Sequence, residues 1–278
     1  MDMTEPLTLM AVHAHPDDES SSTGGVLARY AAEGIRTVVV TCTNGEFGDA
    51  PGGIKPGADG HDPEAVAQLR LGELERACEL LGVAHLELLG YHDSGMPDWE
   101  YKDRDEVFCN VPLEESTERL AKLFQLYRPE VVVTYDEQGG YNHPDHVQAS
   151  RITTAALEAT GIPRKAYLTA RRRRDWAKLR DVLEAQGVEL PPMPQPAPER
   201  LRMMEEAEAR ITTEVDISPY VDVKRTALAT HASQIAESWF GRLPAEAFGS
   251  MFGRETFIRA HDTTGTPVPE DDLFAGLH

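Results

Sequence analysis

Short strand-like runs, two of them rich in β-branched residues, are each followed by a stretch with helical spacing, and this alternation constrains the fold of the chain more than any other feature. The runs span residues 7–12, 37–43, 85–89 and 130–135, and the helical stretches span residues 24–34, 63–81, 113–127 and 146–160. Strands that alternate with helices in this way are typical of a parallel sheet with helices on both faces. The first 160 residues therefore predict an α/β core.

The pattern loosens after residue 160, where shorter elements surround a proline-rich stretch. We expect strands at 165–169 and 256–260, an extended segment at 212–215, helices at 171–186, 199–209 and 221–235, and an elbow at 191–198. A length of 278 residues suits one large α/β domain. We therefore expect a single domain, residues 1–278, in which 1–160 form the core and 161–278 form a smaller C-terminal cap that completes the pocket.

Acidic residues outnumber basic ones, 47 against 27, which gives a formal net charge of −20. Such a chain is repelled by nucleic-acid phosphates and by anionic membrane surfaces, so we expect neither as a partner. The three cysteines, Cys42, Cys78 and Cys109, form no CxxC motif. Since the chain also shows no secretion signal and no apolar run of the roughly 18 residues that span a bilayer, we expect a cytoplasmic protein.

Unusual polar clusters follow three of the expected strands. They lie at residues 13–19, 91–95 and 135–146. In open parallel sheets, ligands bind outside the carboxyl ends of the strands. The fold prediction therefore places the three clusters around one site.

The first cluster, HAHPDDE at residues 13–19, combines two histidines and three acids. These groups would repel one another and desolvate badly if they were buried without a counter-charge. A divalent cation removes both problems, because His15 and Asp18 can converge on one ion while Asp17 stays free to act as a base. The alternative is a solvated loop that caps the next helix.

The second cluster, YNHPDH at residues 141–146, places His143 and His146 three residues apart. Three ligands and one open position are typical of a catalytic zinc site. His15, Asp18 and His146 would supply two imidazoles and one carboxylate, a set that suits Zn²⁺ and tolerates Fe²⁺. No cysteine lies in either cluster, which argues against a structural zinc site of the cysteine type.

The motif AHPDDE after the first strand, together with HPDH after a later one, resembles the PIG-L/LmbE-like family of zinc-dependent N-deacetylases. The resemblance implies a Rossmann-like, mostly parallel sheet with helices on both faces. It also implies that His15, Asp18 and His146 are zinc ligands and that Asp17 is the general base. His143 would stabilise the transition state or act as acid, and Asp145 would be the partner that orients it. Tyr141 would lie near the tetrahedral oxygen.

The resemblance assigns substrate hydroxyls to Arg70 and Asp93 and, by a weaker match, a substrate contact to Glu46. His231 is a second weak match. Each has an ordinary alternative: Arg70 as a surface helix residue paired with nearby glutamates, and Asp93 as the start of a simple Asx turn.

Within this family the chain looks most like the actinobacterial mycothiol branch. We therefore expect a hydrolase that removes acetyl from an N-acetylglucosaminyl small molecule such as N-acetylglucosaminyl-inositol. One alternative is a mycothiol S-conjugate amidase or a deacetylase of another N-acylglucosamine conjugate. A remote one is a carbohydrate-binding protein without activity. The expected partner is a small amino-sugar conjugate, and the sequence leaves open whether the chain forms a homo-oligomer.

Overall fold

A computed structural model describes residues 6–185, 187, 198–236, 238 and 240–278. Within them, seven strands form one sheet in the order β3-β2-β1-β4-β5-β7-β6. Their bounds are β1 Thr8–His13, β2 Arg36–Thr43, β3 His85–Tyr91, β4 Val131–Thr134, β5 Lys165–Ala170, β6 Thr213–Asp216 and β7 Arg254–Asp262.

Strands β3, β2, β1, β4 and β5 are parallel, and β7 runs antiparallel to both β5 and β6. Every residue of β1 and β4 is buried. Burial on both faces is the reason that these strands read as continuous apolar runs. The predicted α/β fold with a mostly parallel sheet is confirmed.

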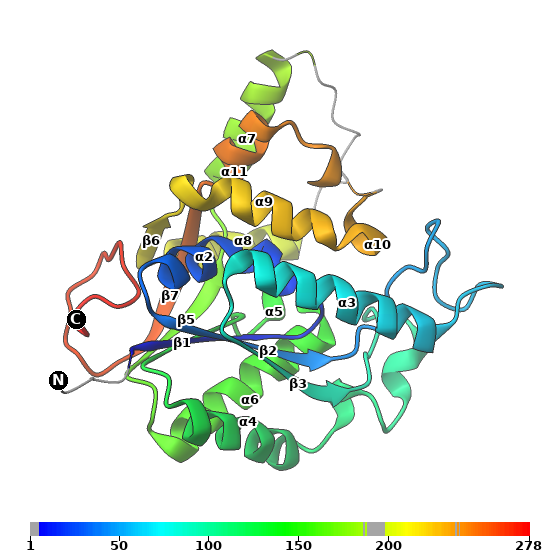
Figure 1. The fold of residues 1–278 in the computed structure, drawn as a ribbon, viewed down its shortest axis with the longest axis horizontal. Helices are drawn as coiled ribbons and strands as arrows, with labels where there is room; N and C mark the ends of the chain where they lie inside the picture. Colours follow the sequence, from blue (N-terminus) through cyan, green and yellow to red (C-terminus); the bar gives the residue numbers. More distant parts are fainter. Residues whose placement is uncertain (1–5, 186, 188–197, 237, 239) are drawn as a thin grey trace.

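Helices cover both faces of the sheet, as predicted (Figure 1). Helices α2 (Gly24–Ala32), α3 (Pro63–Leu81) and α9 (Val221–Thr230) lie on one face. Helices α4 (Leu113–Tyr127) and α6 (Pro144–Thr160) lie on the other. The remaining helices are α1 Asp18–Ser22, α5 Gly139–Asn142, α7 Arg173–Ala185, α8 Pro198–Ala209, α10 Ala232–Ile235 and α11 Ala245–Phe252; the 3₁₀ turns are η1 Glu100–Asp103, η2 Phe108–Asn110, η3 Ser218–Tyr220 and η4 Phe240–Arg242.

Helix α3 shows how local sequence defines an element that serves the site. The Asp62 side chain accepts from the backbone N–H groups of Glu64 and Ala65, and Pro63 occupies the first turn. Gly82 ends the helix with φ 71°, a left-handed conformation that glycine adopts without strain. Between these ends the helix buries Arg70 against the loops that follow β1 and β2.

The structure differs from the predictions mainly after residue 160 and in the short helices. The predicted helix 221–235 is wrong as one piece, because His231 has φ −75° and ψ 47° and separates α9 from α10. Helix α11 and the short helices α1 and α5 were not predicted. Residues 191–197 of the predicted elbow lie outside the described part of the chain.

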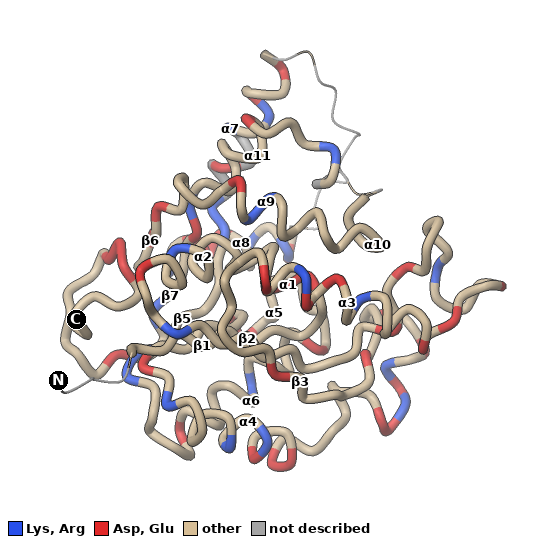
Figure 2. The backbone as a smooth tube through the Cα atoms, viewed as in Figure 1, with Lys and Arg blue, Asp and Glu red and all other residues tan. Residues whose placement is uncertain are grey.

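Acidic residues occur in helices and loops along much of the chain, with basic residues among them (Figure 2). The charge of −20 is therefore not confined to one segment of the chain. No helix in the described part of the chain combines the length and the apolar character needed to cross a bilayer.

The strand order changes direction at one point of the sheet. From β1 the chain continues to β2 and β3 on one side, and β4 then pairs with the opposite edge of β1. Loops that leave neighbouring strands in opposite directions create a ligand site at their carboxyl ends. Here those loops are residues 14–17 after β1 and residues 135–138 after β4.

Candidate metal centre and active site

Three electron-pair donors from the two motifs meet at the carboxyl ends of β1 and β4. They belong to His15, Asp18 and His146, and we call this set the donor triangle. The Nδ1 atom of His15 lies 3.3 Å from Nε2 of His146. The Oδ2 atom of Asp18 lies 3.4 Å from each of these nitrogens. All three residues are buried. The structure thus brings together residues that are 131 positions apart in the sequence.

Hydrogen bonds on the far side of each imidazole set its protonation. Nε2 of His15 lies 3.2 Å from Oδ2 of Asp145, and Nδ1 of His146 lies 3.2 Å from the carbonyl oxygen of Gly139. Both partners can only accept when Asp145 is ionised, so these ring nitrogens carry the protons. In the neutral rings, the nitrogens that face each other present lone pairs.

This arrangement fits a metal ion. With both imidazoles neutral, two ring lone pairs and a carboxylate oxygen repel one another at 3.3–3.4 Å. Ligands that lie about 2.0–2.1 Å from a tetrahedral ion stand about 3.3–3.4 Å apart. The triangle therefore has the size and the donor set of a zinc-type site, and a cation would remove the repulsion.

Two other groupings of potential ligands lie close by. His15, His143 and His146 have ring nitrogens within 4.8 Å of one another, as do one nitrogen of His15 and one oxygen each of Asp93 and Asp145. The second grouping is already joined by the proton on Nε2 of His15, which leaves no lone pair for a metal. The first shares His15 and His146 with the triangle and has His143 in place of Asp18.

Tyr135 holds the Asp18 carboxylate, a contact that the sequence motifs did not indicate. Its hydroxyl donates to Oδ2 of Asp18 at 2.7 Å and accepts from the backbone N–H of Ala14 at 2.8 Å. Its ring stacks on His146 with centroids 4.1 Å apart. The available signal was a tyrosine at the carboxyl end of a buried strand, beside a polar cluster.

The predicted role of Asp145 requires correction. Its carboxylate accepts from Nε2 of His15 and from the backbone N–H and hydroxyl of Ser94, and only its backbone N–H reaches Nδ1 of His143, at 3.3 Å. The expected carboxylate–imidazole pair with His143 is therefore wrong. The physical reason is that His143 caps the N-terminus of α6, which turns the Asp145 side chain toward β1 and β3.

His143 is neutral in this setting. Burial lowers its pKa to about 2, with the nearby imidazoles of His15 and His146 acting in the same direction. Because Nδ1 accepts from the Asp145 backbone, Nε2 carries the proton. The Tyr141 ring lies edge-on to His143 and His146, and the residue is 42% exposed.

Asp17 stands beside the donor triangle without joining it. Oδ2 of Asp17 lies 3.1 Å from Nη2 of Arg70. Burial raises the pKa of Asp17 to about 6, opposed by the Arg70 guanidinium. The surface alternative for Arg70 is wrong, because its side chain is buried and also donates to the carbonyl oxygens of Pro16 and Gly45.

The predicted substrate contacts Asp93 and Glu46 lie next to this centre. Oδ1 of Asp93 accepts from the Gly95 backbone in an Asx turn and lies 3.6 Å from Nε2 of His15. Glu46 binds Nδ1 of His92 at 2.6 Å and the Asp93 backbone N–H at 3.1 Å. Glu46 and His92 line a cavity of about 430 Å³, whose other lining residues include Phe47, Arg104 and Val107.

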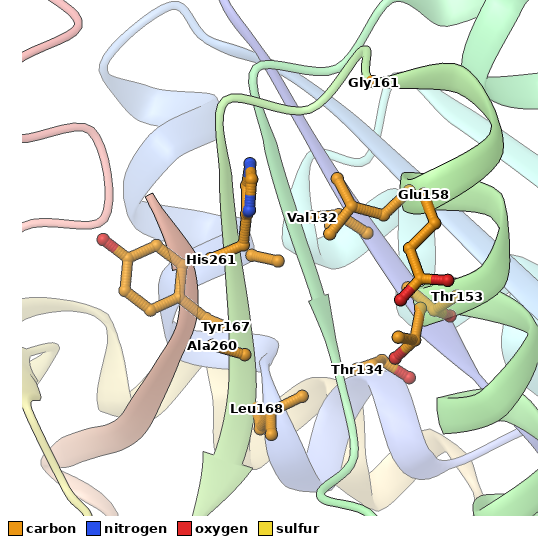
Figure 3. A pocket seen from close by; sticks show the side chains of 12 residues that line it. Val132, Thr134, Thr153, Glu158, Gly161, Tyr167, Leu168, Ala260 and His261 are labelled. Atoms are coloured by element: carbon orange, nitrogen blue, oxygen red, sulfur yellow. The ribbon is translucent and has the colours of Figure 1, made fainter. Parts of the chain in front are cut away.

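A second cavity, of about 360 Å³, lies between α6 and strands β4, β5 and β7 (Figure 3). None of the predicted site residues lines it. The hydroxyls of Thr134 and Thr153 in its wall donate to backbone carbonyl groups. The residues with site chemistry therefore gather at the carboxyl edge of β1 and β4, away from this cavity's lining.

The fold and the paired motifs define a class that comparison with known proteins identifies. A family model described as PIG-L, GlcNAc-PI de-N-acetylase, matches residues 10–157. The chain belongs to the PIG-L family. The predicted family is confirmed, and with it the class of hydrolase that acts on amide bonds.

Two curated relatives extend over most of the chain. The mycothiol S-conjugate amidase of Streptomyces coelicolor is 35% identical, with 99% of each chain covered. The 1D-myo-inositol 2-acetamido-2-deoxy-α-D-glucopyranoside deacetylase of Saccharomonospora viridis is 41% identical over 82% of this chain and 85% of the relative. Among solved structures, the N,N′-diacetylchitobiose deacetylase of Pyrococcus horikoshii shares the fold with a TM-score of 0.58 at 20% identity, covering 92% of this chain and 84% of that one.

Proposed function

We propose that this protein is a metal-dependent deacetylase of an N-acetylglucosaminyl small molecule, with N-acetylglucosaminyl-inositol as the substrate. The observation that carries the proposal is the triangle of His15, Asp18 and His146 with the carboxylate of Asp17 beside it. The deacetylase relative at 41% identity supports the choice of substrate.

His15, Asp18 and His146 would hold the metal, which we propose to be Zn²⁺, with Fe²⁺ as the alternative. Such an ion lowers the pKa of a bound water toward about 7 and polarises a carbonyl group. The chain supports it through the hydrogen bonds of Asp145 to His15, Gly139 to His146 and Tyr135 to Asp18. Partners of this kind fix the orientation of metal ligands.

Asp17 would move the proton that amide hydrolysis requires. Its carboxylate accepts a proton from the attacking water, and the same group returns it to the nitrogen of the departing amine. Arg70 fixes one oxygen of this carboxylate and anchors the loops on either side through Pro16 and Gly45. Asp17 therefore needs no large movement between the two transfers.

His143 and Tyr141 would stabilise the oxyanion of the tetrahedral intermediate. The neutral His143 presents the Nε2 proton, and the Tyr141 hydroxyl is a second donor. Donors aimed at developing charge contribute strongly in sites that exclude water. His143 would act in its neutral form, because burial disfavours the imidazolium form.

The remainder of the substrate would lie against Asp93, Glu46 and the cavity beside them. This cavity, of about 430 Å³, falls within the size range of small-ligand pockets. Its lining mixes the apolar groups of Phe47 and Val107 with the charged groups of Glu46 and Arg104. Such a mixture suits a polyol or sugar ring, which offers both hydroxyls and C–H faces.

A mycothiol S-conjugate amidase is the second candidate. It is favoured by the relative that matches 99% of both chains at 35% identity. Both reactions release the same glucosamine nitrogen and need the same centre. They differ in the acyl group, which is acetate in one and a cysteine-derived mercapturate in the other.

The proposal is tested by metal analysis of the purified protein, combined with amine-release assays on matched substrates. We expect about one metal ion per chain, loss of activity with a chelator, and recovery with Zn²⁺ or Fe²⁺. Acetate release from N-acetylglucosaminyl-inositol supports the deacetylase, and mercapturate release from an S-conjugate supports the amidase. A protein that binds metal but hydrolyses neither substrate would favour the carbohydrate-binding alternative.

We also propose a cytoplasmic location. Cys42, Cys78 and Cys109 are all free thiols in the structure, and Cys42 and Cys78 are buried. Unpaired cysteines of this kind suit a reducing compartment.

A further inference from the structure

The residue after Asp18 forms a buried ion pair to which the proposed reaction assigns no role. Oε1 of Glu19 lies 2.7 Å from Nε2 of His231, and both side chains are fully buried. The two residues are 212 positions apart. His231 comes from the break between α9 and α10, so the helix is interrupted where its ring meets α1.

The second oxygen of Glu19 reaches the residue that we propose as the base. Oε2 accepts from the backbone N–H of Asp17 at 3.0 Å. Asp17 has φ 127° and ψ −24°, a left-handed conformation that residues with a side chain rarely adopt. Such conformations cost about 1–3 kcal/mol and persist only where the surroundings hold them.

The Asp17 backbone is therefore fixed by Glu19, while its side chain is fixed by Arg70. Without Glu19, the peptide before Asp17 would be free to turn toward a relaxed conformation. The carboxylate would then move relative to the donor triangle. His231 can balance the buried charge of the Glu19 carboxylate, whereas its other donors, the Ser20 hydroxyl and the Asp17 backbone N–H, are neutral.

We propose that Glu19 and His231 are positioning residues that hold the strained backbone of Asp17 and thereby aim its carboxylate at the reacting water. The inference rests on the proposed function, since it takes Asp17 as the base. It gives the C-terminal segment, through His231, a direct part in the geometry of a site whose other groups come from the first 160 residues.

The test compares His231→Leu, which removes the hydrogen-bond donor, with His231→Gln, which keeps one. A matched control is Glu270→Gln, which disturbs another buried pair: Nζ of Lys165 lies 2.5 Å from Oε1 of Glu270. For each variant we would measure metal per chain, kcat, KM and hydrogen exchange of the Asp17 amide. The exchange measurement reports the bond to Glu19 without requiring any turnover.

For His231→Leu we expect a fall in kcat of about 10–100-fold, because small misplacements of reacting groups have effects of this order. KM should stay within about twofold, metal content should be retained, and exchange of the Asp17 amide should become at least about tenfold faster. His231→Gln should recover most of both changes. Glu270→Gln should lower stability without altering kcat or this exchange.

Two results would overturn the inference. One is a His231→Leu protein with wild-type kcat per bound metal and unchanged exchange at Asp17. The other is a loss of activity that follows loss of metal in proportion. If the wild-type protein hydrolyses no amino-sugar amide, the proposed function fails instead, and the exchange data still show whether the pair holds the Asp17 backbone.

Discussion

Two buried polar networks in this molecule are built from similar groups but differ in how their charges are balanced. At the end of the sheet formed by β5, β7 and β6, Glu270 binds Lys165, Arg259, Tyr167 and Thr213, and each of these groups donates to it or carries positive charge. At the carboxyl edge of β1 and β4, lone pairs of His15 and His146 face each other and an oxygen of Asp18.

The difference teaches that burial of polar groups does not by itself mark a functional site. The Glu270 network satisfies its own anion, as buried polar networks that stabilise a fold must do. In the donor triangle, the lone pairs of the two neutral imidazoles and the carboxylate oxygen face one another, while the imidazole N–H groups point away from the triangle. Such an arrangement suits a cation at its centre, and this imbalance supports the proposed metal site.

The largest effect is expected for the triangle itself. Asp18→Ala should abolish metal binding and reduce kcat/KM to below about one-thousandth, because both water activation and carbonyl polarisation are lost. Metal analysis and amine-release kinetics measure the two changes. His143→Ala serves as the control: it should lower the rate and keep the metal. Loss of metal in His143→Ala with retention in Asp18→Ala would mean that the three histidines form the site.

The next effect isolates the proton-transfer group from the metal ligands. Asp17→Asn preserves the shape of the side chain but removes its basicity, so kcat should fall about 100- to 10,000-fold with metal content unchanged. Single-turnover kinetics together with metal analysis check both parts. An Asp17→Asn protein that turns over at a near-normal rate would remove Asp17 from the mechanism.

The residues of the donor triangle could be predicted from the sequence, because they lie in local motifs. AHPDDE and HPDH each follow a buried strand, and the rule that ligands bind at the carboxyl ends of parallel strands was enough to bring His15, Asp18 and His146 together. The sheet order explains why, since β1 and β4 are neighbours at the point where the chain reverses direction across the sheet.

Contacts between distant segments could not be predicted in the same way. The spacing in HPDH suggested that Asp145 serves His143, but the helix cap turns its carboxylate toward His15. Nothing local in residues 221–235 indicated a break at His231, whose partner Glu19 lies in the first cluster. These features depend on tertiary geometry, and tertiary contacts override the helical pattern of a single segment.

A substitution in the Glu270 network should change the stability of the protein and leave the metal site unaffected. Glu270→Gln removes the only carboxylate that faces Nζ of Lys165 within the described contacts, and leaves that ammonium buried at 0% exposure. Breaking a buried pair from one side typically costs about 3 kcal/mol or more. Urea unfolding should show this loss, while metal content and kcat stay at wild-type values. A change in metal affinity would mean that the two networks are coupled.

The smallest effect tests a single hydrogen bond with an internal match. Tyr135 donates to Asp18 and accepts from the Ala14 backbone, and Tyr30 makes the same pair of bonds with Asp272 and the Leu273 backbone. Both hydroxyls are buried, so Tyr135→Phe and Tyr30→Phe should lose similar stability, about 1 kcal/mol. Only Tyr135→Phe should weaken metal binding, by about tenfold, because the hydrogen bond that orients a ligand is lost.

Competition with a chelator measures the affinities of these two variants, and urea unfolding measures their stabilities. Equal affinities in Tyr135→Phe and Tyr30→Phe would show that the Asp18 carboxylate needs no support from Tyr135. A tenfold difference in metal affinity at equal stability would show the reverse. The Tyr135 hydroxyl would then have a functional role because its acceptor is Asp18, while the Tyr30 hydroxyl, with equivalent bonds, would contribute to stability alone. The pair thus separates the effect of the Tyr135 hydroxyl on the metal site from the stability that a buried hydroxyl with equivalent bonds contributes elsewhere in the fold.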